Sequence, residues 1–191
     1  MKIDVKDKKS IQEKITELTA IGSIFEDEKA FVFIELLIKK ANNNLKLAKI
    51  VFDISSNSKQ KANHKLLEGD SFYDWVIITS YYAMFHITHS LLATKKIRIR
   101  NIRVHEATLY AFAHHFILTK ELEDDLFLMY EDAEARANQL FNELSEEKQK
   151  RGQFTYERLP KANKEPAEES LNNAIKFVRD IESIVRKRWR I

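Results

Sequence analysis

The longest apolar run without a formal charge extends from Trp75 to Thr94, inside the stretch Asp70–Lys96. Hydroxyl and imidazole groups are scattered through it, and apolar and polar residues do not alternate with a period of two. This pattern predicts a helix that is buried on most of its circumference. About 20 such residues would also span a bilayer. Histidines and hydroxyls on every side would need partners in lipid, so the central helix of a bundle is the better interpretation.

The rest of the chain predicts amphipathic helices separated by short connections. They are expected to run from Ser10 to Gly22, from Asp27 to Ser55, from Ile102 or Val104 to Phe116, from Thr119 to Gly152 and from Pro166 to Val185. Ser10 and Thr119 are predicted as N-caps. The polar segment Ser56–Gly69 predicts a loop with about one helical turn, and Lys95–His105 is expected to hold two or three extended residues. The predicted fold is therefore all-α, an antiparallel bundle of five to six helices.

Composition supports this fold class. The 191 residues include only three glycines and two prolines, as expected for long helices with few turns. We expect residues 26–191 to form the bundle and residues 1–25 to form a helical extension. The chain has no cysteine, so disulfides and thiolate ligands are excluded. No apolar segment follows the N-terminal lysines, so no secretory signal is predicted and the cytoplasm is the expected location.

Charge is unevenly distributed along the chain. The net charge of +3 is too small to indicate a nucleic-acid-binding protein by itself. Basic residues gather in Lys95–Arg103 and Arg186–Arg190, and acidic residues gather in Glu121–Glu134. Such runs are most often solvated faces, and the two signs could also pair between protomers.

The segment RNIRVH, Arg100–His105, is the first candidate for chemistry. The Arg100 guanidinium could hold a phosphate through two N–H groups, while the His105 imidazole moves a proton from a ribose 2′-hydroxyl or to the leaving oxygen. Backbone N–H groups at the start of the following helix would add to an anion site. Arginine and histidine occur at such spacings by chance, but Asn101 directly after Arg100 makes the pattern more specific.

A second candidate consists of Tyr82, His86 and His89, which lie on one face of the predicted central helix. They are interpreted either as core side chains hydrogen-bonded within the protein or as part of a metal site with His114 and His115. The core interpretation is favoured. No Glu-x-x-His pair occurs, which argues against a di-iron carboxylate bundle. We expect neither a metal nor another cofactor.

The segment SYYAMFHITHSLLATKK, Ser80–Lys96, resembles the central helix of HEPN domains, a family of small α-helical proteins. The likeness is in a tyrosine pair followed by Ala, Met, Phe and His and then by a leucine pair. Upstream, Ala41–Ile54 is similar to the first long helix of the family. Downstream, His105 and the segment Arg151–Glu157 are similar to later elements. The resemblance covers residues 30–185.

This resemblance implies a helical bundle that dimerises with a basic cleft at the dimer axis. Family members with an arginine, a polar residue and a histidine four to six residues after the arginine act as metal-independent endoribonucleases, often as toxins. The implied catalytic residues are Arg100 and His105. The implied substrate-binding residues are Asn101, Arg98, Arg103, Tyr82, His86, Arg151 and Tyr156. The expected ligand is RNA or a nucleotide, with no membrane partner.

Two alternatives remain open. Other HEPN members lack activity and bind nucleotides or partner a small nucleotidyltransferase. By this resemblance the chain would be a non-catalytic, nucleotide-binding module of a two-protein system with a nucleotidyltransferase antitoxin. The other alternative is a helical homodimer whose basic and acidic faces pair with each other and leave no ligand site.

Overall fold

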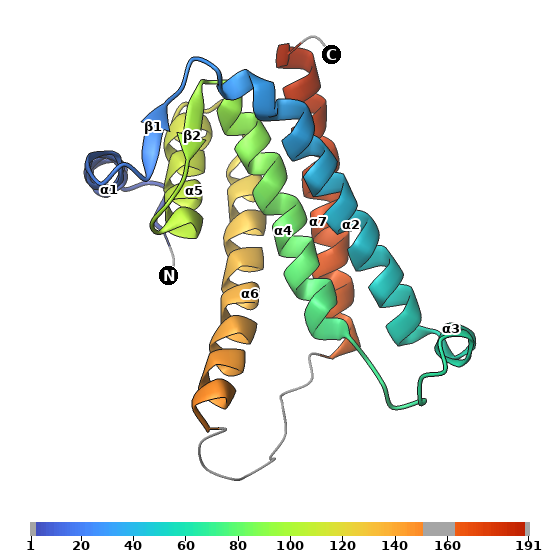
Figure 1. Ribbon diagram of the computed structural model, residues 1–191. Helices are drawn as coiled ribbons and strands as arrows, with labels where there is room; N and C mark the ends of the chain where they lie inside the picture. Colours follow the sequence, from blue (N-terminus) through green and yellow to red (C-terminus); the bar gives the residue numbers. More distant parts are fainter. Residues whose placement is uncertain (1–2, 151–162, 190–191) are drawn as a thin grey trace.

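The chain folds around one central helix, α4 (Tyr73–Ala93), in a computed structural model that describes residues 3–150 and 163–189. Three long helices pack around it: α2 (Ile34–Ser56), α6 (Asp124–Lys150) and α7 (Lys164–Trp189) (Figure 1). Helices α2 and α6 run antiparallel to α4, and α7 runs in the same direction as α4. The all-α fold class is confirmed.

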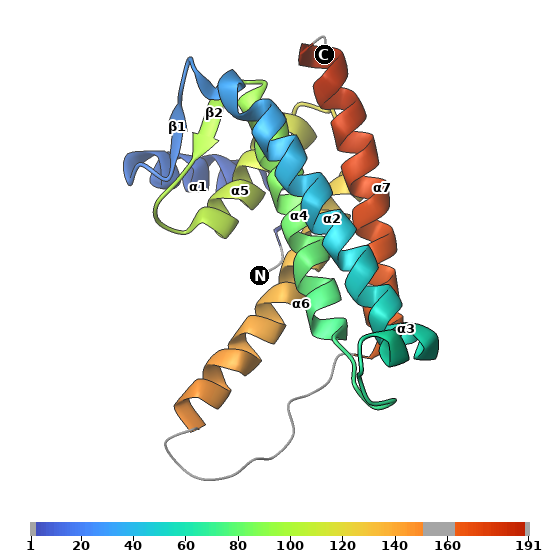
Figure 2. The same cartoon turned by 45° about the vertical axis from the view of Figure 1, so that its right-hand side comes forward.

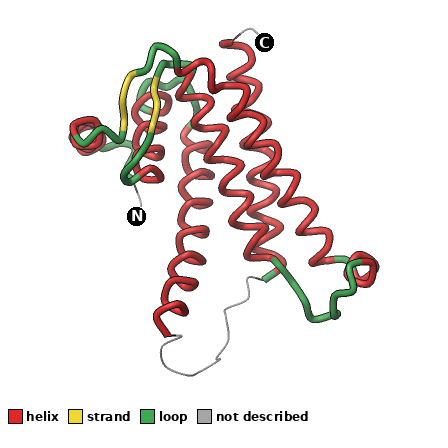
Figure 3. Tube along the Cα trace, viewed as in Figure 1, coloured by secondary structure: helices red, strands yellow, loops and turns green. Residues whose placement is uncertain are grey.

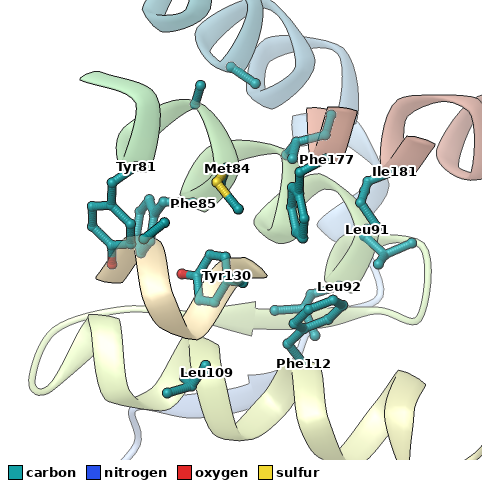
Figure 4. Close-up of a cluster of buried hydrophobic side chains, with 14 of the residues drawn as sticks. Tyr81, Met84, Phe85, Leu91, Leu92, Leu109, Phe112, Tyr130, Phe177 and Ile181 are labelled. Atoms are coloured by element: carbon teal, nitrogen blue, oxygen red, sulfur yellow. The ribbon is translucent and has the colours of Figure 1, made fainter. Parts of the chain in front are cut away.

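Helix α4 is buried along most of its length, as its lack of charge predicts. Its side chains Tyr81, Met84 and Leu91 meet Phe112 and Phe177 from neighbouring helices in one core (Figure 4). By length and composition it is the one helix of the described residues that could cross a membrane. Within the protein, however, 83% of that window is buried, which is what the core helix of a bundle requires.

A smaller layer lies beside the bundle and is formed by α1 (Lys8–Ala20), α5 (Val104–Phe112) and two short strands (Figure 2). Strand β1 (Ile24–Glu26) pairs antiparallel with β2 (Ile97–Ile99) (Figure 3). In this pairing Phe25 lies opposite Arg98. Both isoleucines of β2 are buried, whereas Arg98 between them is partly exposed. The expected extended residues after the central helix are therefore confirmed.

Two helix starts differ from the prediction, and a carboxylate that accepts backbone hydrogen bonds lies near each of them. The N-cap of α1 is Asp7, whose carboxylate accepts a hydrogen bond from the backbone N–H of Ser10 at 3.0 Å, so Ser10 lies inside the helix. After β1, the carboxylate of Asp27 accepts from the N–H of Lys29 at 2.9 Å before the short 3-10 helix η1 (Ala30–Phe33). Helix α2 therefore begins at Ile34 and not at Asp27.

A short helix, α3 (Ser58–Asn63), occupies part of the predicted loop. The Asn57 side chain caps it by accepting from the N–H of Lys59 at 3.0 Å. With α3 the described residues contain seven α-helices, one more than the upper number expected.

The connection between α5 and α6 also differs from the prediction. Helix α5 continues as a π-helical turn, η2 (Ala113–Ile117), so the helical extent is as expected. Thr119 does not cap the next helix, because its hydroxyl donates to the His115 carbonyl at 3.0 Å and closes η2; helix α6 begins at Asp124. Pro166 lies in the first turn of α7 as predicted, and Gly152 lies outside the described residues.

Candidate functional site

The segment Arg100–Arg103 forms a tight turn between β2 and α5. Asn101 and Arg103 adopt left-handed backbone conformations, with φ of 69° and 54°. The turn is anchored by residue 23, because the Arg100 N–H donates to the Ser23 carbonyl at 3.1 Å and the Ser23 hydroxyl donates to the Ile102 carbonyl at 2.6 Å. This anchoring holds a strained backbone at the start of α5.

The three arginines of this region differ in how far their charges are neutralised. Arg98 pairs with Asp27 at 3.0 Å, and Arg103 pairs with Glu17 and Glu106. The Arg100 guanidinium lies 4.2 Å from the ring centroid of Phe25 and has no carboxylate partner among the described residues. Arg100 is therefore the arginine of this region whose positive charge is not neutralised by a carboxylate and is available to a ligand.

His105, in the first turn of α5, is held against α4. Its Nδ1 lies 2.6 Å from the Tyr81 hydroxyl, and its ring centroid lies 5.0 Å from that of Phe85. Tyr81 is 1% exposed, and its hydroxyl interacts with the buried hydroxyl of Tyr130, so its O–H can point to Tyr130 while its oxygen accepts from Nδ1–H of His105; we assign this tautomer. The neutral His105 ring then carries its hydrogen on Nδ1 and a lone pair on Nε2, which has no hydrogen-bond partner in residues 3–150 and 163–189. Burial lowers the pKa of His105.

Tyr82 lies next to His105, and His86 lies next to Tyr82. The Tyr82 ring centroid is 6.2 Å from that of His105 and 6.3 Å from that of His86. The Nδ1 of His86 is buried without a hydrogen-bond partner in the described part of the chain. Burial, reinforced by the charge of Lys40, lowers the pKa of His86 to about 4, so this ring is neutral near pH 7.

The two ends of the Arg100–His105 motif face different elements. Arg100 contacts Phe25 of β1, whereas His105 contacts Tyr81 and Phe85 of α4. Among the described residues, no hydrogen bond or ring contact joins the two side chains. Asn101 is exposed beside Arg100, and the predicted binding residues Arg151 and Tyr156 lie outside the described residues.

Two residues that shape this site, Tyr81 and Thr108, were not predicted from the sequence. Tyr81, not its neighbour Tyr82, holds His105, and Thr108 holds His89 through a 2.8 Å hydrogen bond to Nε2. The tyrosine pair was a visible signal, but helical spacing alone does not show which tyrosine meets a residue 24 positions later. The described residues contain no group of three or more His, Asp or Glu side chains placed to hold a metal ion.

Comparison with known proteins gives two matches. A protein of Methanocaldococcus jannaschii named "Putative toxin MJ0142" is 41% identical to this chain over 61 residues, which is 32% of this chain and 40% of that protein. This chain thus covers less than half of the length of that relative. The sequence model of the family described as HEPN domain matches residues 54–184, more than half of the chain. The chain therefore belongs to the HEPN domain family.

Proposed function

We propose that this HEPN protein binds RNA and cleaves it without a metal ion, through Arg100 and His105. One observation carries the proposal: the turn before α5 holds an arginine with no carboxylate partner among the described residues, and the first turn of α5 holds a histidine whose Nδ1 is occupied by Tyr81. A free guanidinium suits a phosphate, and a fixed imidazole with Nε2 available suits proton transfer.

In the proposed reaction, the ribose 2′-oxygen forms a bond to the neighbouring phosphorus and the bond from phosphorus to the 5′-oxygen breaks. The products are a 2′,3′-cyclic phosphate and a 5′-hydroxyl. Nε2 of His105 takes the proton of the 2′-hydroxyl, and water gives a proton to the leaving 5′-oxygen. Arg100 stabilises the charge that develops on the phosphate oxygens.

The other predicted binding residues have supporting roles in this proposal. Asn101, exposed beside Arg100, would hydrogen-bond the RNA backbone, and the rings of Tyr82 and His86 would contact a base next to His105. Arg98 and Arg103 are engaged in ion pairs, so they contribute positive potential more than direct contacts. Arg151 and Tyr156 remain proposed binding residues from the family resemblance alone.

A toxin role in a two-protein system is part of the proposal and is supported by the name of the M. jannaschii relative. A homodimer that brings two Arg100–His105 turns to a shared groove, and an antitoxin that covers that groove, are proposed with it.

The test is cleavage of labelled RNA by the purified protein in excess chelator. We expect the wild type to produce fragments that end in a cyclic phosphate and His105→Ala to be at least about 100-fold slower, since general acid–base groups contribute about that much or more. His64→Ala is the matched control, because His64 is exposed after α3 and lies outside the site. Equal cleavage by wild type and His105→Ala, or cleavage by neither, contradicts the proposal.

A further inference from the structure

The outward side of α2 carries a row of exposed apolar side chains. Four large apolar residues there are between 47% and 60% exposed: Val32 in η1, and Leu36, Leu47 and Ile50 in α2. The other side of the helix packs against α4 and α7. Figure 2 shows α2 lying over α4, with no other described element in front of it. The helix therefore has one covered apolar side and one uncovered apolar side.

The exposed positions are spaced as in a coiled coil. Steps of four and three residues, the spacing of the positions that meet a second helix, join Leu36, Lys40, Asn43, Leu47 and Ile50. We call these five residues the α2 seam. Asn43 in its middle is exposed, and a single polar residue at such a position fixes the register of paired helices. The pattern indicates a surface for helix-to-helix packing.

The α2 seam is bordered by positive charge. Four exposed lysines lie in it or beside it: Lys39, Lys40, Lys46 and Lys49. None of these lysines forms an ion pair within residues 3–150 and 163–189. Helix α2 has two carboxylates, and that of Glu35 lies 3.6 Å from the guanidinium of Arg186, which leaves Asp53 to oppose the lysines. A complementary partner is therefore acidic.

We propose that the α2 seam binds an amphipathic helix of another protein, with apolar side chains in the seam and acidic residues at both flanks. The apolar side chains would cover Leu36, Leu47 and Ile50, as an amphipathic helix covers a hydrophobic groove. The acidic residues would pair with the lysines that border the seam. Neither Arg100 nor His105 lies on α2, so this proposal does not depend on RNA cleavage.

Two other occupants fit the same face less well. A second copy of this chain would place the same excess of lysines over Asp53 against itself, and like charges would oppose the pairing. A helix that binds an anionic membrane has a broad apolar face. The α2 seam is narrow and includes Lys40 and Asn43, so a partner helix is favoured over a membrane.

The first experiment adds the full chain to two fluorescent synthetic peptides and follows their anisotropy. Both peptides are about three heptads long, with leucine at positions a and d. One carries glutamate at positions e and g, and the other carries lysine there, so neither pairs with itself near pH 7. We expect the glutamate peptide to bind at least about tenfold more tightly than the lysine peptide. No saturable binding of the glutamate peptide, or equal binding of both, overturns the proposal.

A pair of leucine variants tests the assigned face. Leu47 and Leu128 are similarly exposed, at 47% and 54%, but Leu128 lies on α6 and outside the seam. Leu47→Glu should weaken binding of the glutamate peptide about tenfold or more, because it removes an apolar contact and adds a like charge. Leu128→Glu should bind as the wild type does, and neither variant should change the unfolding midpoint. Equal loss of binding in both variants contradicts the assigned face.

Charge reversal tests the flanks of the seam. The double variant Lys39→Glu/Lys46→Glu should prefer the lysine peptide over the glutamate peptide. Lys8→Glu is the matched control, because Lys8 is an exposed lysine at the start of α1 with no ion pair among the described residues. It should keep the preference of the wild type. An unchanged preference in the double variant shows that the lysines do not select the partner and overturns the proposal.

Two further measurements test the other occupants. In sedimentation equilibrium we expect Leu47→Glu to have the mass of the wild type; a dimer that this variant alone dissociates assigns the face to a second copy and overturns the proposal. Sedimentation with phosphatidylserine vesicles that Leu47→Glu abolishes would assign it to a membrane instead. RNA cleavage should be the same in Leu47→Glu and the wild type, so failure of the peptide experiments and failure of the proposed function are read separately.

Discussion

The two halves of the candidate site differ in how the fold holds them. On α4 and α5, His105 is enclosed by aromatic rings and its Nδ1 is fixed by the buried Tyr81. In the turn before α5, Arg100 is exposed over Phe25 without a carboxylate partner among the described residues. Removing an enclosed polar group lowers the free energy of unfolding, whereas removing an exposed charge changes it little. The His105 half should therefore matter for stability, and the Arg100 half for ligand binding. Substitutions in the two halves should therefore have different effects.

The largest effect on stability is expected when the pH is lowered, because His89 on α4 then becomes protonated. Its pKa falls from 6.5 in the unfolded chain to about 3 in the folded protein, because burial disfavours the imidazolium. The unfolded state therefore binds the proton more readily, so this stabilisation is complete above pH 6.5 and is lost as the pH falls toward 3. Because His89 is partly accessible in the folded protein, we expect a loss of about 2 kcal/mol between pH 6.5 and 4.5.

The measurement is urea unfolding of the wild type and His89→Gln at several pH values. Carboxylates titrate in both proteins, so the difference between their pH dependences isolates the histidine. A wild-type free energy of unfolding that falls with acid no faster than that of His89→Gln contradicts the assigned burial.

A smaller effect is expected from Tyr81→Phe, which removes the hydroxyl and leaves the ring in place. We expect the free energy of unfolding to fall by about 1 kcal/mol, the usual contribution of one hydrogen bond. The His105 ring should also lose its fixed tautomer, which the ¹⁵N chemical shifts of the two ring nitrogens report by NMR.

The adjacent Tyr82 provides the matched control, because its hydroxyl has no hydrogen-bond partner in residues 3–150 and 163–189. Tyr82→Phe should change neither the unfolding curve nor the His105 nitrogen shifts. Unchanged shifts in Tyr81→Phe would show that the tyrosine does not orient the imidazole.

Local sequence predicts the fold well where one local rule applies. The charge-free run predicts α4, and the alternation of Ile97, Arg98 and Ile99 predicts β2, since both follow from which faces can be buried. The predicted start of a helix was wrong where more than one polar residue could serve as its N-cap. Asp7 supersedes Ser10 at α1, and the competition is settled by backbone geometry that the sequence does not display.

The site was less predictable because its environment is made by distant residues. RNIRVH identifies Arg100 and His105 as candidates, but the charge left on each arginine depends on carboxylates far along the chain. Arg98 is paired with a residue 71 positions away, and Arg103 with one 86 positions away. The same holds for His105, whose tautomer is set by Tyr81. Such pairings appear only when the helices have packed.

The smallest effect on stability, and the clearest on binding, is expected from Arg100→Gln. Because Arg100 has no ion pair among the described residues, its urea unfolding midpoint should match that of the wild type. Its affinity for single-stranded RNA should fall about threefold to tenfold, and the slope of log affinity against log salt should become shallower by about 0.7, as expected for one lost phosphate contact. Arg103→Gln is the matched control: its guanidinium is bound to Glu17 and Glu106, so this variant should lower the midpoint slightly and keep the wild-type salt slope. If the two variants reduce the salt slope equally, RNA competes successfully with the carboxylates for Arg103, and the difference between the arginines does not decide which of them binds phosphate.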